Sequence, residues 1–289
     1  MNNIEIINKN SKTLKTLLKS HGFSKRSISE LMKNGIKVNN DIVFRSIEIF
    51  KGDRISIDVD DEQLDHKPIK GDLKILYEDN NILIISKSSG LTINSAHDIN
   101  LANIVAYYFK LNNINSKIRF INRLDMNTSG IMMIAKNKYA QAYYQNEIEN
   151  NKIIKKYLAY VPGNVIIDKK ISLILSYDEE NKNYKVSDNG RKSITIFKTI
   201  ERNEKYSIID CDIKTGKTHQ IRASLSYLGY PIIGDKLYGS EIDLNRFLLH
   251  SYYLSFTKFL SEESIFIKDV PNFQTLIQDL WKDYLEIKF

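Results

Sequence analysis

The sequence has very little of what builds a covalent or membrane-embedded scaffold. It contains one cysteine, Cys211, which has no partner for an internal disulfide, as is typical of a protein kept in a reducing compartment. No apolar run approaches the roughly 18 residues of a membrane span. The first residues lack the basic region and apolar core of a signal peptide. These absences argue against secreted, transmembrane and disulfide-scaffold proteins and predict a cytoplasmic location.

The size and the charge leave other classes open. A chain of 289 residues suggests one large domain or two smaller ones. Such a chain can bury ~75% of its unfolded surface, so it needs neither disulfides nor metal ions to fold. The 42 Lys and Arg exceed the 35 Asp and Glu, which gives a net charge of +7. AT-rich coding would itself produce many lysines, so the position of the charge is more informative than its sum.

Basic residues gather near the N-terminus. Residues 12–37 contain seven Lys or Arg but only one acidic residue, Glu30. Leucines at helical spacing followed by Gly22 predict a short helix. Ser24 is suited to cap a second helix, which Gly35 would end. The segment therefore predicts two short helices with a local excess of positive charge.

Strands and a linker are expected after these helices. Alternating apolar residues predict strands at 36–38, 42–43 and 54–59. Residues 61–72 lose periodicity and are acidic at their start, which is typical of a linker. We therefore predict a small N-terminal α+β domain at residues 1–60, a linker at 61–72 and a second domain at 73–289.

The second domain shows mixed signals. Short apolar or alternating segments predict strands at 82–85, 131–135, 156–161, 194–197, 206–213 and 248–256. Helical spacing predicts helices at 101–111, 138–148, 218–228 and 273–285. Because these helices are placed too irregularly for a repeating βαβ pattern, we predict an α+β fold with a mixed, mainly antiparallel sheet flanked by helices.

Several familiar catalytic motifs are absent. Gly216-Lys217-Thr218 resembles the end of a phosphate-binding P-loop, but the glycine required five positions earlier is replaced by Cys211. No G-x-S-x-G elbow is present. The five histidines have no zinc-like spacing with one another or with the cysteine, so no metal site is predicted.

Two dense polar segments remain. Residues 120–130 are either a surface turn or a loop that presents Asp125 on a rigid scaffold. Residues 214–222 pass through Gly216 into a predicted helix, whose N-terminus beside Lys217 suits an anionic phosphate. The alternative for this second segment is an ordinary helix cap with a salt bridge.

Both segments resemble motifs of one enzyme family. Residues 122–130 read Asn-Arg-Leu-Asp-Met-Asn-Thr-Ser-Gly and resemble the H-R-L-D-x-x-T-S-G motif of RluA-type pseudouridine synthases. Residues 215–222 and 229–239 resemble that family's T-G-R-T-H-Q-I-R and G-x-P-I-x-G-D-x-x-Y-G blocks. Residues 156–159, Lys-Tyr-Leu-Ala, resemble its segment that carries the active-site tyrosine. The blocks occur in order over nearly the whole chain, which makes the resemblance specific.

Further segments extend the resemblance. Residues 75–90 resemble the opening strand and K-P-A-G loop, and Leu249-His250 matches a later L-H-A segment. The basic N-terminal unit resembles an S4 RNA-binding domain. Four positions depart from the family pattern: Asn122 replaces His, Ser88-Ser89 replaces Pro-Ala, Lys217 replaces Arg and Ser224 replaces a common His.

The resemblance implies an RNA enzyme that isomerises uridine to pseudouridine. The base is detached from the ribose, turned and rejoined through a carbon, which requires no redox cofactor and no metal. The implied catalytic residues are Asp125 at the ribose, Tyr157 stacked on the flipped base and Arg222 paired with the aspartate. The implied RNA contacts are Lys25, Arg26, Asn122, Arg123, Lys217, His219 and Gln220.

The substrate expected from this architecture is ribosomal RNA of the large subunit, 23S in bacteria, with transfer RNA as the alternative. A catalytically silent RNA-binding or ribosome-assembly protein on the same scaffold is a second alternative. A third alternative is an unrelated Asp-dependent hydrolase, but the sequence shows no second carboxylate at a fixed spacing to support it. A monomer without a small-molecule cofactor is expected.

Overall fold

The computed structural model describes residues 2–59, 62–95, 99–273 and 275–278. The N-terminal unit, residues 2–59, contains a four-stranded antiparallel sheet in the order β1-β4-β2-β3. Its elements are β1 (Asn2–Ile7), α1 (Leu14–Ser20), α2 (Lys25–Asn34), β2 (Ile36–Val38), β3 (Asp41–Val43) and β4 (Arg54–Val59). Thr13 and Ser24 cap the two helices with their side chains, as the serine signal predicted for α2.

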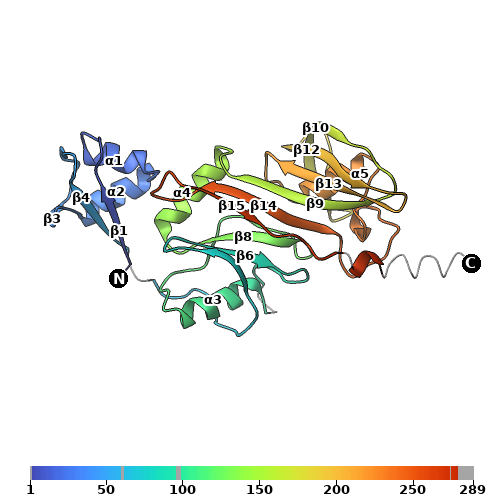
Figure 1. Cartoon of the computed structure of the whole chain (residues 1–289), viewed down its shortest axis with the longest axis horizontal. Coiled ribbons are helices and arrows are strands. Elements are labelled where there is room, and N and C mark those ends of the chain that lie inside the picture. The colour runs from blue at the N-terminus through green and yellow to red at the C-terminus, as the bar shows by residue number, and fades with distance from the viewer. Residues whose placement is uncertain (1, 60–61, 96–98, 274, 279–289) are drawn as a thin grey trace, which may run out of the picture.

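The main sheet has eleven strands, nine of them in the order β11-β10-β12-β13-β9-β14-β8-β6-β5 (Figure 1). β15 pairs with β14, and β7 pairs with β8. Among the described strands, neighbours are antiparallel except β8 and β14, which run parallel. The predicted α+β class with a mainly antiparallel sheet is confirmed.

The bounds of the elements beyond the N-terminal unit are as follows. The strands are β5 (Lys74–Glu78), β6 (Ile82–Lys87), β7 (Arg119–Phe120), β8 (Ser129–Ala135), β9 (Ile154–Pro162), β10 (Asp168–Asp178), β11 (Asn183–Val186), β12 (Arg191–Arg202), β13 (Tyr206–Ile213), β14 (Leu249–Thr257) and β15 (Ser264–Lys268). The helices are α3 (Leu101–Leu111), α4 (Lys138–Glu149), α5 (Gln220–Tyr227) and the 3-10 turn η1 (Lys236–Tyr238).

The sheet is buried on both faces at β6 and β8. Alternate residues of these strands face opposite sides, so Ile84 and Met133 pack with α4, whereas Leu83 and Met132 pack with α3. α5 packs on the same side as α3 through Ile221 and Leu225. Two-sided burial explains why the sequence reads as continuous apolar runs here and not as alternation.

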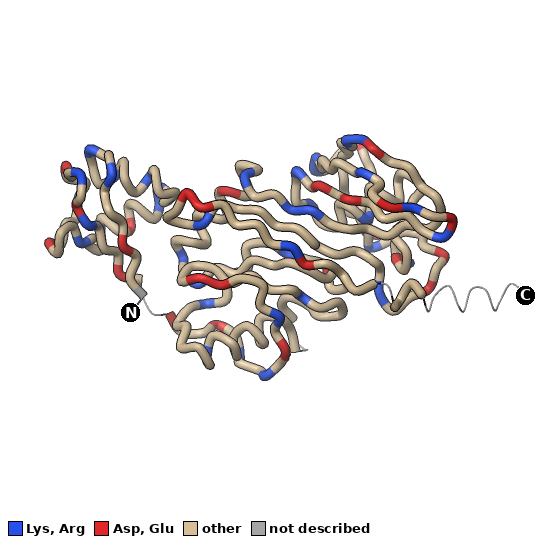
Figure 2. The backbone as a smooth tube through the Cα atoms, in the orientation of Figure 1, with Lys and Arg blue, Asp and Glu red and all other residues tan. Residues whose placement is uncertain are grey.

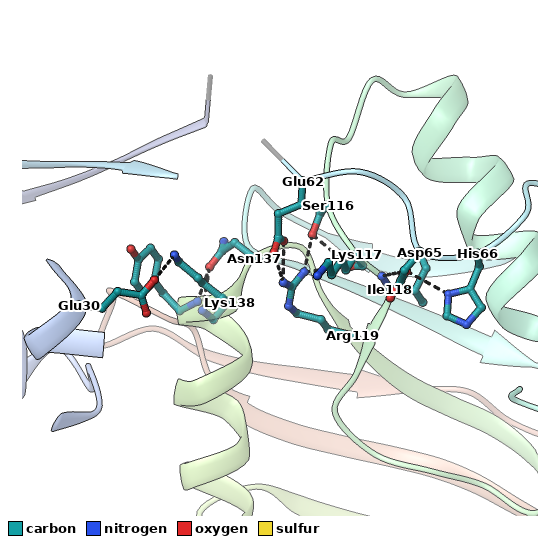
Figure 3. Close-up of polar contacts among 12 residues, drawn as sticks. Glu30, Glu62, Asp65, His66, Ser116, Lys117, Ile118, Arg119, Asn137 and Lys138 are labelled. Carbon is teal, nitrogen blue, oxygen red and sulfur yellow. Dashed lines mark hydrogen bonds and ion pairs between the residues drawn. The ribbon is translucent and has the colours of Figure 1, made fainter. Parts of the chain in front are cut away.

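The predicted linker is docked on the main sheet. Its described residues have no regular secondary structure. The Glu62 carboxylate pairs with Arg119 at 2.6 Å, and Asp65 accepts a hydrogen bond from the Ile118 backbone at 2.9 Å (Figure 3). The Asn103 amide of α3 donates to the Lys67 carbonyl. These contacts hold the segment against the surface of the protein.

The N-terminal unit packs on α4 and on the loop after β14. Phe23 is 5% exposed and lies 5.4 Å from Tyr139 and 5.6 Å from Phe259, measured between ring centroids. Glu30 of α2 also pairs with Lys138 of α4 at 2.7 Å (Figure 3). An apolar contact flanked by an ion pair thus joins the two sheets, and acidic and basic residues occur on both sides of the junction (Figure 2).

Several strands were not anticipated. The sequence analysis missed β1, the β10–β11 hairpin and β15, most of whose described residues are exposed or half-buried. Residues 275–278 are helical, and the rest of the helix expected at 273–285 lies mainly outside the described residues. No helix in the described part of the chain is long and apolar enough to cross a membrane.

The junction generates a prediction about stability. We expect Phe23→Ala to lower the free energy of unfolding by ~3 kcal/mol, because the substitution leaves a cavity between the two sheets. Phe50 in the same unit is 72% exposed, and Phe50→Ala should change stability by no more than ~0.5 kcal/mol. Urea denaturation measures both variants. Equal losses in the two would contradict a shared core at the junction.

Candidate active site

A cleft of about 970 Å³ opens between the loop before β8, the strand β9 and the start of α5. Eight predicted site residues line it: Asp125, Tyr157, Arg222, Asn122, Arg123, Lys217, His219 and Gln220. Lys25 and Arg26 lie elsewhere, exposed on the first turn of α2. The fold therefore brings the two polar segments of the sequence together and leaves the N-terminal cations on a separate surface.

The Asp125 loop is held against the strand that follows it. The Asn122 amide oxygen accepts from the Met133 backbone at 2.8 Å, and its nitrogen donates to the Ile131 carbonyl at 3.3 Å. The Thr128 backbone closes a turn on the Asp125 carbonyl. Both ends of the Asn122 amide are thus bonded to β8. This favours a role in holding the loop, instead of the RNA contact predicted from sequence.

Lys87 fixes the same loop from the other side. Its buried ammonium donates to the carbonyls of Ser88, Leu91 and Met126 at 2.8–2.9 Å. Burial, with the nearby Arg246 charge, lowers the pKa of Lys87 to about 8. The sequence analysis placed Lys87 only in the segment that resembles the opening loop. Its role in holding the Asp125 loop was not predicted, because its carbonyl partners come from two separate segments of the chain.

Gly130 lets two strands approach closely next to the loop. It has φ +111°, and a Cβ atom there would lie 2.2 Å from the Ser251 carbonyl oxygen. Ser251 faces Gly130 in the parallel pairing of β14 with β8. Only glycine combines this backbone conformation with this contact, which explains why a glycine, Gly130, follows Thr128 and Ser129.

Arg222 on α5 connects two carboxylates. Its Nε and Nη2 donate to both oxygens of Asp235 at 2.7 and 2.9 Å, while Nη1 donates to Asp125 Oδ2 at 3.0 Å. The side chains of Arg222 and Asp235 are only 6% and 1% exposed, whereas that of Asp125 is 27% exposed. The guanidinium is therefore anchored by the buried aspartate and presents its remaining edge to the aspartate in the cleft.

Aromatic rings fix the plane of this guanidinium. Its Cζ atom lies 4.2 Å from the ring centroid of Phe247 and 4.9 Å from that of Tyr238. Burial alone would lower the pKa of Arg222, but the hydrogen bonds and charges of the two aspartates outweigh burial and leave it raised. Arg222 therefore stays charged. The other oxygen of Asp125, Oδ1, has no hydrogen-bond partner in the described part of the chain.

His219 stands beside the same carboxylate. It precedes α5 in the left-handed conformation, with φ 53°, which is unusual for a residue other than glycine and strained. Its Nε2 lies 3.7 Å from Asp125 Oδ2. Burial lowers the pKa of His219, with the Arg222 charge adding to the effect and Asp125 opposing it, so the ring is neutral near pH 7.

The hydroxyl of Tyr238 selects the tautomer of this neutral ring. It accepts a hydrogen bond from the Tyr184 backbone at 2.9 Å and lies 3.0 Å from His219 Nδ1. Because the hydroxyl proton has no other acceptor among the described residues, the hydroxyl is placed to donate it to Nδ1. The proton of His219 then sits on Nε2, the nitrogen nearer Asp125.

Gln220 braces the loop before α5. Its amide oxygen accepts from the Thr215 hydroxyl and the Lys217 backbone, and its nitrogen donates to the Ile194 carbonyl and Thr195 hydroxyl. The residue is 4% exposed. Four internal hydrogen bonds use the whole amide. Gln220 is therefore better suited to holding this loop than to the direct RNA contact predicted from sequence.

Tyr157 forms part of the cleft wall from β9. It is 7% exposed and is paired with Ser251 on the neighbouring strand β14. Burial raises the pKa of Tyr157 above its ordinary value, so the phenol is protonated at physiological pH. The ring can stack on a base, and the hydroxyl can donate a proton but not accept one as a phenolate.

The cleft shows no sign of a metal centre. Within the described residues, no group of three His, Cys, Asp or Glu side chains is arranged to hold a metal ion. The groups that face the cleft are one carboxylate, a neutral imidazole, a buried phenol and several cations. This set suits a polyanionic substrate on which a single carboxylate acts.

Comparison with known proteins identifies the family. Residues 81–227 match the family model of RNA pseudouridylate synthases. The chain is 34% identical over 281 residues to an uncharacterized RNA pseudouridine synthase of Bacillus subtilis, YhcT, covering 94% of this chain and 91% of the relative. It is 34% identical over 238 residues to ribosomal large subunit pseudouridine synthase D of Borreliella burgdorferi, covering 74% and 73% of the two chains.

A solved structure agrees in fold. Human RNA pseudouridylate synthase domain containing 1 has a TM-score of 0.61 and 24% identity, over 72% of this chain and 87% of that one. The family match includes Asp125, Tyr157 and Arg222, the three residues expected to be catalytic. The chain therefore belongs to the RNA pseudouridine synthases, the isomerases that convert uridine in RNA to pseudouridine.

Proposed function

We propose that this enzyme modifies uridine in ribosomal RNA of the large subunit, with Asp125 as its catalytic carboxylate. The observation that carries the proposal is the carboxylate itself: one oxygen is held by Arg222, and the other faces a wide cleft with no partner among the described residues. Two relatives whose names specify large-subunit synthases, from Borreliella burgdorferi and from Buchnera aphidicola, support the choice of RNA.

Asp125 acts at the ribose of a flipped nucleotide. Its target is inaccessible in a stacked helix, so the uridine must leave the stack at a cost of a few kcal/mol. The carboxylate then serves as the nucleophile or assists glycosidic cleavage. Because Asp235 already neutralises Arg222, the guanidinium orients Asp125 without cancelling the negative charge that the reaction needs.

Tyr157 and His219 act on either side of this carboxylate. The Tyr157 ring stacks on the flipped uracil, and its protonated hydroxyl donates a proton as the base is turned. The Nε2 proton of His219 faces the same part of the cleft and binds a polar group of the nucleotide.

The RNA strand is held by cations around the cleft and on the N-terminal unit. Arg123 is exposed at the cleft edge and Lys217 lies before α5, both in reach of phosphates. We assign residues 1–60 as an S4-like RNA-binding domain, 61–72 as a linker and 73–289 as the catalytic domain. Lys25 and Arg26 are the proposed phosphate contacts of the first domain.

The alternatives are weighed by the site. A catalytically silent RNA-binding protein would not need a carboxylate held by a buried, ring-sandwiched guanidinium. Transfer RNA would enter the same cleft, and the RNA mapping below separates it from ribosomal RNA. A cytoplasmic monomer without a metal or small-molecule cofactor completes the proposal.

The role of Asp125 is tested in cells. In a deletion strain, we expect wild-type enzyme to restore pseudouridine at specific large-subunit ribosomal RNA positions and Asp125→Asn to restore none. The variant should fold normally, because Asp125 is partly exposed and Arg222 keeps its two bonds to Asp235. Asp243→Asn is the control, since that side chain is 74% exposed.

Sequencing-based pseudouridine maps of total RNA give the readout. Sites restored equally by Asp125→Asn would remove Asp125 from the mechanism. Sites lost only from transfer RNA would replace the proposed substrate while keeping the chemistry.

Tyr157→Phe separates stacking from proton donation. We expect this variant to keep its affinity for RNA and to lose about 10²-fold in kcat, because the ring remains and the hydroxyl is gone. Tyr157→Ala should also lose ~1–3 kcal/mol of binding free energy. Single-turnover kinetics and equilibrium binding measure the two effects. Full activity of Tyr157→Phe would exclude a proton role.

The N-terminal cations are tested through salt. We expect the double variant Lys25→Ser/Arg26→Ser to bind RNA more weakly and to lower the slope of log K against log[salt] by about 1.4 if both contact phosphate. Its single-turnover rate at saturating RNA should equal that of the wild type. An unchanged slope would count against RNA binding by this surface.

A further inference from the structure

Lys155 is a buried cation with no counter-ion among the described residues. It lies on β9, is 9% exposed and lines the cleft. In the described part of the chain its ammonium makes neither a hydrogen bond nor an ion pair. The next residue, Lys156, projects from the other face of the strand and pairs with Asp210 at 3.3 Å. Two adjacent lysines thus have opposite surroundings.

Burial of this ammonium is unfavourable for the protein alone. Removing a charge from water without a compensating partner destabilises the charged form, and a lysine in that position responds with a lowered pKa. The pKa of Lys155 is indeed lowered, with burial as its cause. A methionine would fill the same space without this cost, so stability does not account for a lysine here.

The position of Lys155 relates it to the reacting nucleotide. Lys155 and Tyr157 are two residues apart on one strand, so their side chains leave the same face about 6.6 Å apart. The Lys155 Nζ atom reaches the loop before α5 and lies 3.9 Å from where a Cβ atom of Gly216 would be. The glycine leaves this side of the cleft open next to the cation.

The charge of the missing partner follows from electrostatics. Uracil is neutral, and its carbonyl groups would leave the buried ammonium without a counter-charge. A phosphodiester carries one negative charge, and a lysine ammonium binds it as a compact point charge. An RNA strand that places a uracil on Tyr157 necessarily brings its own phosphates into this cleft.

We propose that Lys155 binds a backbone phosphate of the RNA strand next to the target uridine, and so positions that nucleotide for Asp125. This proposal rests on the proposed function in that the strand in the cleft is a substrate RNA. It adds a substrate-binding residue to the site. Lys155 is supplied by β9, whereas the Arg222 guanidinium is supplied by α5.

The test compares two isosteric variants, Lys155→Met and Lys156→Met. The probe is an unmodified in vitro transcript of large-subunit ribosomal RNA, and binding is measured over a series of KCl concentrations. We expect Lys155→Met to lower the slope of log K against log[salt] by about 0.7, the value for one phosphate contact on a single strand. Lys156→Met should leave the slope unchanged.

Thermal unfolding of the same proteins supplies the second readout. Lys155→Met should unfold at the same or a higher temperature than the wild type, because it removes an unpaired buried charge. Lys155→Gln serves as a second variant if the methionine protein is insoluble. Weaker RNA binding together with unchanged or increased stability supports a substrate contact.

Two outcomes would overturn the proposal. An unchanged salt slope for the Lys155 variants would mean that the ammonium meets a neutral group or no RNA. A lowered unfolding temperature with an unchanged slope would assign the lysine a structural role. Pseudouridine formation on the transcript is measured separately: its absence in the wild type would contradict the proposed substrate, while the salt slope still decides the role of Lys155.

Discussion

The active site depends on one guanidinium shared between two carboxylates. Asp235 holds Arg222 by two hydrogen bonds in a nearly solvent-free position, and the rings of Phe247 and Tyr238 fix its plane. The third nitrogen then points in a set direction and orients Asp125. A guanidinium suits this task because its planar fork offers separate donors to two acids, which an ammonium does not.

The charges around this cluster suit catalysis on RNA. Two aspartates and one arginine leave one net negative charge, and the neighbouring His219 is neutral because burial lowers its pKa. Arg123, Lys155 and Lys217 line the same cleft. The proposed catalytic carboxylate of Asp125 can therefore stay negative inside a cleft whose other cations attract a polyanion.

The junction between the two sheets bears on how RNA is presented. The described part of the linker is hydrogen-bonded to the main sheet, and Phe23 packs into a core shared with α4. The N-terminal unit is thus held by packing and does not hang on a free tether. An N-terminal unit fixed at a set position would restrict which RNA shapes reach both the cleft and the proposed phosphate contacts at Lys25 and Arg26.

Local signals were sufficient for much of the fold. The helix expected at 101–111 coincides with α3, and the strand expected at 206–213 coincides with β13, because apolar spacing and end signals act within a few residues. The hairpin β10–β11 escaped this reasoning, since most of its residues are exposed or half-buried and give a weak apolar signal.

The sequence by itself determined the family blocks, the α+β class and the eight candidates that line one cleft. Tertiary structure alone decided which of these side chains face the cleft and which are bonded within the protein. Asn122 and Gln220 look polar and available in sequence, yet their amides are consumed by backbone and hydroxyl partners. Lys155 and Lys156 are indistinguishable neighbours until the strand turns one into the cleft and the other toward Asp210, because hydrogen-bond partners and burial come from segments far away in the chain.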